Sequence, residues 1–108
     1  MLAKYIQDGK YIDYTPTVDI TAGDIVVIGS IVGIANHDIA AGETGIGAIC
    51  IEGVIEVPTD GTAITAGAVV YWNATAKQAT LTSTGNTLMG KSITAATATD
   101  EVVRVKLG

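Results

Sequence analysis

The sequence is poor in the residue types that build most cores and most polar surfaces. It has no Phe, one Trp, one Cys and two Pro, and charged residues make up 16% of its 108 positions, against about 25% in typical soluble domains. Cys50 is the single cysteine, so no disulfide can form within the chain, and synthesis in a cytoplasm is expected. No run of 18 apolar residues and no basic leader is present, so no membrane partner is predicted.

Positive charge is also scarce. Six Lys and Arg residues are set against eleven Asp and Glu, which gives a net charge of −5, and no two cations form a run. Because nucleic-acid binding requires a concentrated positive surface, no nucleic-acid partner is predicted.

The remaining composition is apolar, with 48% hydrophobic residues and a mean hydropathy of +0.44. Such a chain has little charge to cover its outside. We therefore expect other subunits to bury part of the surface, as in a homo-oligomer. A weakly charged monomer is the alternative.

Thirteen glycines, fifteen threonines and many Val and Ile residues favour strands and tight turns over helices. The longest predicted strand, 46–57, has Ile49, Ile51, Ile55 and Val57 on one face and Cys50, Glu52, Val54 and Glu56 on the other, with Gly53 as a bulge or bend. The closing EVVRVKLG alternates with Val103, Val105 and Leu107 facing inward. Thr94–Glu101 is at most one short helical turn. The predicted fold is all-β, a single domain over residues 1–108 built as a small barrel or sandwich. Shorter strands are predicted at 25–29, 31–36, 68–72, 77–82 and 87–93.

An N-terminal hairpin is predicted within an arm of residues 1–15. Asp8-Gly9 separates two β-prone runs and suits a two-residue turn, which places Tyr5 opposite Ile12 and Lys4 opposite Asp13. Tyr5, Tyr11 and Tyr14 make this the most aromatic part of the chain. They fit either core packing or a contact surface, where tyrosine is enriched.

A short phrase recurs as ITAGDIVVIG at 20–29, IAAGETGIG at 39–47 and ITAGAVVYW at 64–72. It predicts a turn whose Gly has a positive φ, followed by a strand. The spacings of 19 and 25 residues indicate a repeated turn and not a solenoid.

The stretch GNTLMGKS at 85–92 matches the phosphate-binding pattern G-x-x-x-x-G-K-[ST]. A working phosphate loop follows a buried parallel strand and opens a helix. Here the following SITAATATDEVVRV does not resemble a helix, and no apolar strand ending in Asp is available for magnesium. We therefore predict a turn at Gly85-Asn86, a strand after it, and Lys91 pointing to solvent.

No other group of residues predicts catalysis, a cofactor or a metal site. His37-Asp38 with Ser30 or Cys50 could suggest a nucleophile and base, but neighbours in a strand face opposite ways, and a surface loop is expected. One His and one Cys cannot form a zinc site, and the acidic residues lack the spacing of a calcium loop. Those acidic residues, expected to be solvated, are Glu43, Glu52, Glu56 and Asp60.

Taken in order, several phrases of the chain resemble the capsid cement, or head decoration, proteins of tailed phages and prophages, a family whose members often carry a recombinase label. Lys91-Ser92, which completes the phosphate pattern, is not part of this resemblance. The resembling segments are YIQDGKYIDYTP, TAGDIVVIGSIVGIANHDIAAGETG, EGVIEVP, ITAGAVVYWNATAKQAT, GNTLMG and VRVKLG.

The resemblance implies a non-enzymatic all-β protein of the virion, made in the bacterial host cytoplasm, that docks on the outside of an assembled head. Its partner would be the major capsid protein, and its copies would form trimers. The residues suggest Tyr5, Tyr11 and Tyr14 as contacts, so deleting residues 1–14 should abolish head binding. Of the adjacent Tyr71 and Trp72, one is expected in the core and the other, with Trp72 the candidate, at an interface. The alternatives are an oligomeric β module unrelated to capsids and a nucleotide- or DNA-binding recombination factor.

Overall fold

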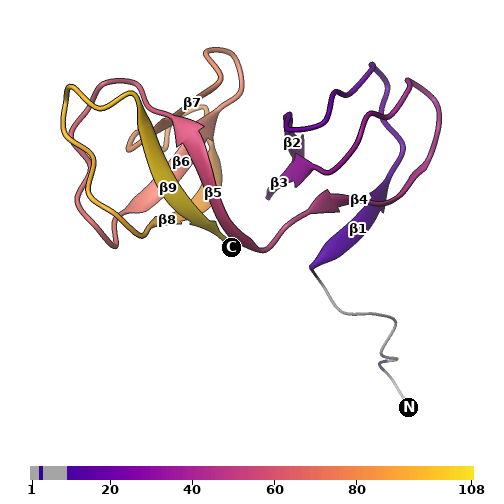
Figure 1. Cartoon of the computed structure of the whole chain (residues 1–108), viewed down its shortest axis with the longest axis horizontal. Helices are drawn as coiled ribbons and strands as arrows, with labels where there is room; N and C mark the ends of the chain where they lie inside the picture. The colour runs from indigo at the N-terminus through magenta and orange to yellow at the C-terminus, as the bar shows by residue number, and fades with distance from the viewer. Residues whose placement is uncertain (1–2, 4–9) are drawn as a thin grey trace.

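The structure is a computed structural model that describes Ala3 and residues 10–108. These residues form strands and turns, with no helix among them (Figure 1). The strands are β1 (Tyr11–Tyr14), β2 (Ile25–Ile28), β3 (Ile31–Ala35), β4 (Gly45–Cys50), β5 (Gly53–Pro58), β6 (Val69–Asn73), β7 (Gln78–Thr80), β8 (Thr87–Ser92) and β9 (Val102–Leu107).

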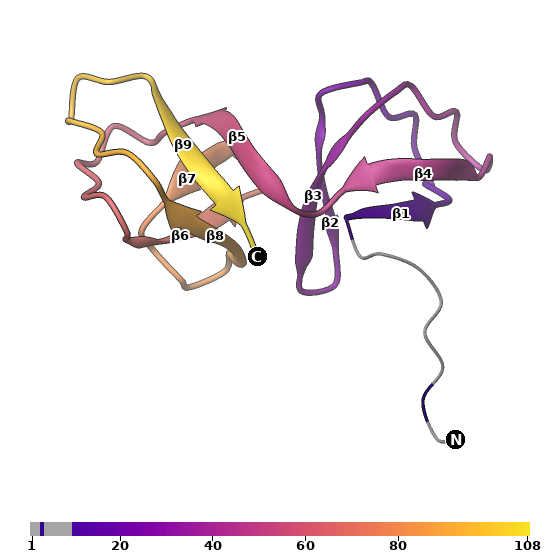
Figure 2. The same cartoon turned by 60° about the horizontal axis from the view of Figure 1, so that its bottom comes forward.

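The strands form two antiparallel sheets that lie in different halves of the molecule (Figures 1 and 2). The first has the order β1-β4-β3-β2 and the second the order β5-β9-β8-β6-β7. The all-β prediction is confirmed. Of the two architectures that the sequence left open, the sheets agree with a sandwich, because neither closes into a barrel.

The two sheets share one topology. When β1, β2, β3 and β4 are matched with β5, β6, β8 and β9, the order β1-β4-β3-β2 becomes β5-β9-β8-β6, and only β7 is additional. The loops match as well. Ile20 and Ile39 exchange two backbone hydrogen bonds of 2.8 and 2.9 Å in the first half, and Ile64 and Ala96 exchange two of 2.8 Å in the second.

The recurring phrase marks the equivalent turns of these halves. Its glycines Gly23, Gly42 and Gly67 have φ values of 91°, 81° and 81°, and each turn leads into a strand, as predicted. A fourth turn, Ala96–Asp100, fills the remaining equivalent place without a glycine, and the Asp100 N–H donates to the Thr97 carbonyl at 3.1 Å. The lack of Gly and Ile there is why the sequence pattern did not reveal it.

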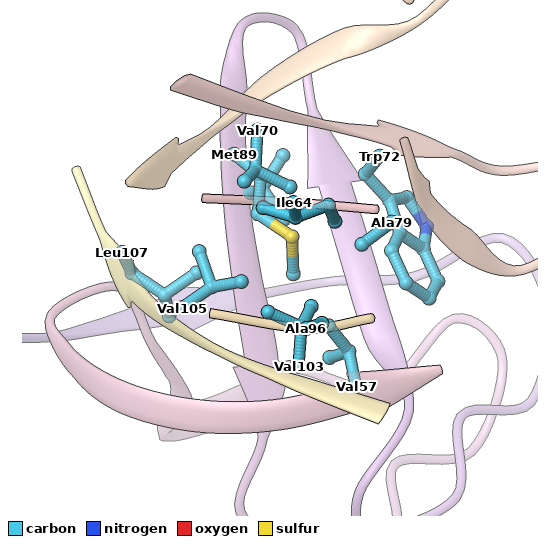
Figure 3. Close-up of a cluster of buried hydrophobic side chains, with 11 residues drawn as sticks. Val57, Ile64, Val70, Trp72, Ala79, Met89, Ala96, Val103, Val105 and Leu107 are labelled. Atoms are coloured by element: carbon cyan, nitrogen blue, oxygen red, sulfur yellow. The ribbon is translucent and has the colours of Figure 1, made fainter. Parts of the chain in front are cut away.

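Each sheet has its own buried cluster, and the β2–β3 hairpin contributes to both. The larger cluster, drawn in Figure 3, contains Trp72, Met89 and the predicted inward residues Val103, Val105 and Leu107. Val32 of β3 belongs to this cluster of the second sheet, whereas Val26 of β2 belongs to the cluster of the first. The hairpin is thus covered on both faces, and this explains why its residues are apolar on both faces.

The predicted strand 46–57 is in fact two strands. The alternation of faces is as expected, with Ile49 and Val57 buried and Glu52 and Glu56 exposed. However, β4 ends at Cys50 and β5 begins at Gly53, which has a φ of 102°, so the chain passes from one sheet to the other. The shorter predicted strands are confirmed within one or two residues, and 94–101 contains only a turn.

The first arm of the predicted hairpin, with Tyr5 and the turn Asp8-Gly9, lies outside the described residues. Its second arm is β1, which pairs antiparallel with β4 through Tyr11–Cys50, Ile12–Ile49 and Tyr14–Gly45. Among the strands that the structure describes, residues 11–14 stand at one end of the first sheet. Deleting 1–14 would remove that strand, so a truncation that tests the arm must stop before Lys10.

Candidate functional site

The phosphate-loop match lies in a strand of the second sheet. The Asn86 N–H donates to the Ser83 carbonyl at 3.1 Å in a turn, and β8 follows, antiparallel to both β6 and β9. Its backbone groups pair with these neighbours instead of forming an open cradle for phosphate. The predicted turn, strand and exposed Lys91 are confirmed.

Ser92 and Gly90, two residues of the pattern, are fixed by their structural surroundings. Ser92 is 2% exposed, and its hydroxyl donates to the Thr65 carbonyl at 2.6 Å and accepts from the Ala68 N–H at 3.1 Å. A Cβ on Gly90 would lie 1.9 Å from the carbonyl oxygen of Lys106, so only glycine lets β8 and β9 approach here. The glycine and serine of GNTLMGKS therefore serve packing.

His37 and Asp38 lie in the exposed turn region after β3 and do not form a dyad. The His37 Nδ1 is 3.1 Å from the backbone oxygen of Asp38, while the Asp38 carboxylate accepts from the Ala22 N–H at 2.8 Å. Cys50 is half-buried, and its thiol donates to the Glu52 carbonyl at 3.0 Å. No hydrogen bond within the described residues joins the imidazole to Ser30 or Cys50.

The four carboxylates expected to be solvated are all exposed. Glu56 Oε2 is 3.5 Å from Arg104 Nε, with both side chains more than half exposed. Burial acts to raise the pKa of Asp60, but hydrogen bonds from Thr80 and Thr62 outweigh it and hold that pKa below its ordinary value. Within residues 10–108, no three His, Cys, Asp or Glu side chains lie close enough to hold a metal ion.

The candidate contact residues differ in exposure. Tyr11 on β1 is 43% exposed, with Lys10 Nζ 5.4 Å from its ring centroid, whereas Tyr14 is partly buried against the first cluster. Trp72 is 6% exposed and belongs to the core of the second sheet (Figure 3). Its neighbour Tyr71 is only partly buried. An interface role for Trp72 stays a prediction that its exposure does not support.

Sequence reasoning did not identify the outer face of the second sheet, where exposed apolar side chains gather. Of ten exposed large hydrophobic residues in the described chain, five lie on β5, β6, β8 and β9 or directly after β8. They are Val54, Val69, Leu88, Ile93 and Val102. The inward partners on these strands fill the core, so alternation leaves the five on the outside.

Three cations lie on the same face. Lys91 on β8 is the cross-strand partner of Lys106 on β9, and Val69 and Val54 are the next partners in the row across the sheet. Arg104 projects from β9 one pair further along, opposite Glu56. We call Lys91, Arg104, Lys106 and the five apolar residues the cationic face. The cationic face could have been predicted from the alternation in β9, had the pairing of β8 with β9 been known.

Cations are missing from the half of the chain that forms the first sheet. Between Lys10 and Lys77 the sequence has no Lys or Arg, and residues 11–51 carry five carboxylates. They are Asp13, Asp19, Asp24, Asp38 and Glu43. Residues 52–108 also carry five carboxylates but have four cations, so residues 11–51 contribute −5 and residues 52–108 contribute −1 to the net charge.

Comparison with known proteins matches one family. The sequence matches the phage cement protein family over residues 6–107. No curated protein and no solved structure matches the chain. Among the described residues there is no helix of the length and hydrophobicity that a membrane crossing requires. Because the match covers nearly the whole chain, this protein belongs to the phage cement protein family.

Proposed function

We propose that this protein binds the outside of an assembled phage head as a homo-oligomer, contacts the major capsid protein and stabilises the shell without catalysis. The observation that carries the proposal is the family match over residues 6–107. The surface supports it, because a weakly charged molecule with six cations and exposed apolar side chains suits contacts with neighbouring subunits. Many copies, each adding a modest contact, would reinforce a shell through multivalency.

We propose that the N-terminal residues up to Tyr14 make the shell contact, with Tyr5, Tyr11 and Tyr14 as its aromatic groups. The exposed ring of Tyr11 lies on β1, which pairs with β4 of the first sheet. The arm would add strands to a sheet edge on the shell, and tyrosine supplies contact area at such interfaces. Tyr14 is partly buried, so Tyr11 is the stronger candidate of these two tyrosines.

The direct test is co-sedimentation of the purified protein with undecorated heads of its source phage. We expect saturable binding and heads that resist higher temperature. A chain starting at Lys10, which keeps β1, and the variant Tyr11→Ser should bind more weakly. Leu81→Ser, an exposed apolar position of 39% exposure next to β7, is the matched control and should bind normally. Failure of the intact chain to bind would contradict the head-binding function and favour a module unrelated to capsids.

The nucleotide-binding alternative makes a separate prediction. A recombination factor would be stabilised by magnesium-ATP through Lys91, whereas a structural protein with Lys91 on an open sheet face would not. We expect equal melting temperatures with and without magnesium-ATP, for the natural chain and for Lys91→Ala. A rise in melting temperature that Lys91→Ala abolishes would overturn the structural role of GNTLMGKS.

A further inference from the structure

We propose that the cationic face of one copy binds an acidic surface with exposed apolar side chains at the far end of the first sheet of a second copy. The inference rests on the self-association in the proposed function and names the surfaces that make it. Both surfaces are present in the same chain, so the partner is argued from the molecule itself.

The cationic face is incompletely matched in one copy. Lys91 and Lys106 are direct cross-strand partners, and like charges in that position repel. Within the described residues the one ion pair on this face is Glu56 with Arg104, so neither lysine has a carboxylate partner there. An acidic surface placed over the face would relieve the repulsion and cover the exposed apolar side chains beside it.

The complementary surface is formed by residues 13–19 and 41–47, which we call the acidic end. Backbone and side-chain hydrogen bonds hold the two segments together. The Asp13 carboxylate accepts from the Gly47 N–H at 2.7 Å, the Asp19 carboxylate from the Ala41 N–H at 2.9 Å, and the Gly42 N–H donates to the Pro16 carbonyl at 2.8 Å. The acidic end is therefore a defined surface and not two independent loops.

The acidic end carries both exposed apolar side chains and carboxylates. Ile46 and Val18 are 73% and 64% exposed, the two largest values for large hydrophobic residues in the described chain. Asp13, Asp19 and Glu43 belong to the same two segments, and neither segment contains a Lys or Arg. This arrangement complements the cationic face, where valines and a leucine lie beside Lys91 and Lys106.

The two surfaces cannot meet within one copy. The acidic end includes the end of β1 and the start of β4, which lie on the side of the first sheet away from the second sheet (Figure 2). Contact between unlike surfaces of identical chains is head-to-tail, and repeated contacts of that kind close into a ring or extend as a filament. A ring would expose the same edges of every copy to one underlying shell.

The test is the association of the purified full chain without heads, followed by light scattering and sedimentation across a range of concentration and salt. We expect association that weakens as salt rises, because opposite charges are screened. Lys91→Glu with Lys106→Glu should raise the dissociation constant by about a hundredfold or more, since like charges would then face each other across the contact. Lys10→Glu with Lys77→Glu makes the same change in net charge off this face and should leave association unchanged.

A charge exchange identifies the partner surface. Val18→Lys with Glu43→Lys adds positive charge to the acidic end at two exposed positions and should weaken association on its own. Mixed in equal amounts with the Lys91→Glu, Lys106→Glu variant, it should restore assembly, because each altered surface then meets an opposite charge. Circular dichroism should show that every variant is folded.

The proposal is wrong if the natural chain stays monomeric, if the double lysine variant associates normally, or if the mixture does not assemble. A lysine variant that self-associates normally but no longer sediments with heads would assign the face to the shell, which also overturns the proposal. Failure of head binding with intact self-association would instead contradict the proposed function alone.

Discussion

Lys91 and Lys106 face each other as direct partners across β8 and β9, on the outer side of a sheet whose inner side is a closed apolar core. Two like charges in this position lower the stability of the single copy, and they do so in a chain that has only six cations. The pair is understandable if the sheet face has a negative partner.

Replacing one lysine converts repulsion into attraction. We expect Lys91→Glu to raise the free energy of unfolding of the monomer by about 0.2–1 kcal/mol, through its new pair with Lys106. Urea unfolding at low protein concentration and low salt measures it. Lys91→Gln removes only the repulsion and should give a smaller increase, and a loss of stability in both variants would contradict the cross-strand geometry.

Val32 tests whether the two halves unfold together. Its side chain is 5% exposed and belongs to the cluster of the second sheet, although its strand belongs to the first. We expect Val32→Ala to lower the free energy of unfolding by about 2 kcal/mol while a single transition remains. Trp72 fluorescence and far-ultraviolet circular dichroism should coincide.

The neighbouring Ile31, 43% exposed on the same strand, is the control for Val32. Ile31→Ala should change the free energy of unfolding by less than about 1 kcal/mol. Two separated transitions in calorimetry of the natural chain would contradict the prediction of a single domain over residues 1–108.

Alanine substitutions at Gly90 and Gly85 compare two reasons for glycine within GNTLMGKS: close packing of strands at Gly90 and a positive φ at Gly85. At Gly90 an added Cβ would overlap the backbone of β9, whereas at Gly85, with a φ of 74°, it would meet nothing within 4 Å. We expect Gly90→Ala to cost about 3 kcal/mol or more, because backbone must move. Gly85→Ala should cost about 1 kcal/mol. Equal losses by denaturant unfolding would show that β8 and β9 do not approach so closely.

Asp60 predicts a pH dependence. Its pKa is lowered in the folded protein by hydrogen bonds from Thr80 and Thr62, which outweigh the opposing effect of burial. Its contribution to stability is therefore complete above the unfolded pKa of about 3.9 and is lost as the pH falls through the lower folded value. Asp60→Asn should flatten the decrease in melting temperature below about pH 4.

Glu43→Gln, at an exposed carboxylate in the turn before β4, is the control for Asp60 and should retain the full decrease in melting temperature. A decrease that is identical in the natural chain and in Asp60→Asn would show that the hydrogen bonds from Thr80 and Thr62 do not stabilise the ionised carboxylate.

The prediction for 46–57 shows where local pattern stops being sufficient. The residues expected to share one face, Ile49, Ile51, Ile55 and Val57, all pack inward: Ile49 and Val57 are buried, and Ile51 and Ile55 are partly buried against the two clusters. The change of sheet between Cys50 and Gly53 leaves no break in that alternation, because it depends on which strands supply hydrogen-bond partners. Those partners are β1 and β3 for β4, and β9 for β5.

For the candidate surfaces, too, the local pattern predicted one part and strand pairing decided the other. The exposure of Lys91, Arg104 and Lys106 followed from alternation along their own strands, whereas the contact of Lys91 with Lys106 required the register of β8 against β9. Trp72 shows what alternation along a strand leaves undecided. An aromatic pair in a strand predicts one buried and one outer ring, but which side is the core depends on the rest of the sheet.

By itself, the sequence determined the all-β class, the short strands with their inward faces and the glycine turns, because each depends on residues within a few positions of one another. The tertiary structure alone decided that these strands form two sheets of one topology, that the β2–β3 hairpin contributes to both cores, and that Lys91, Arg104 and Lys106 share one outer face. The physical reason is that strand pairing joins residues far apart in the chain, and the pairing adopted is the one in which the inward apolar faces of the strands are buried together.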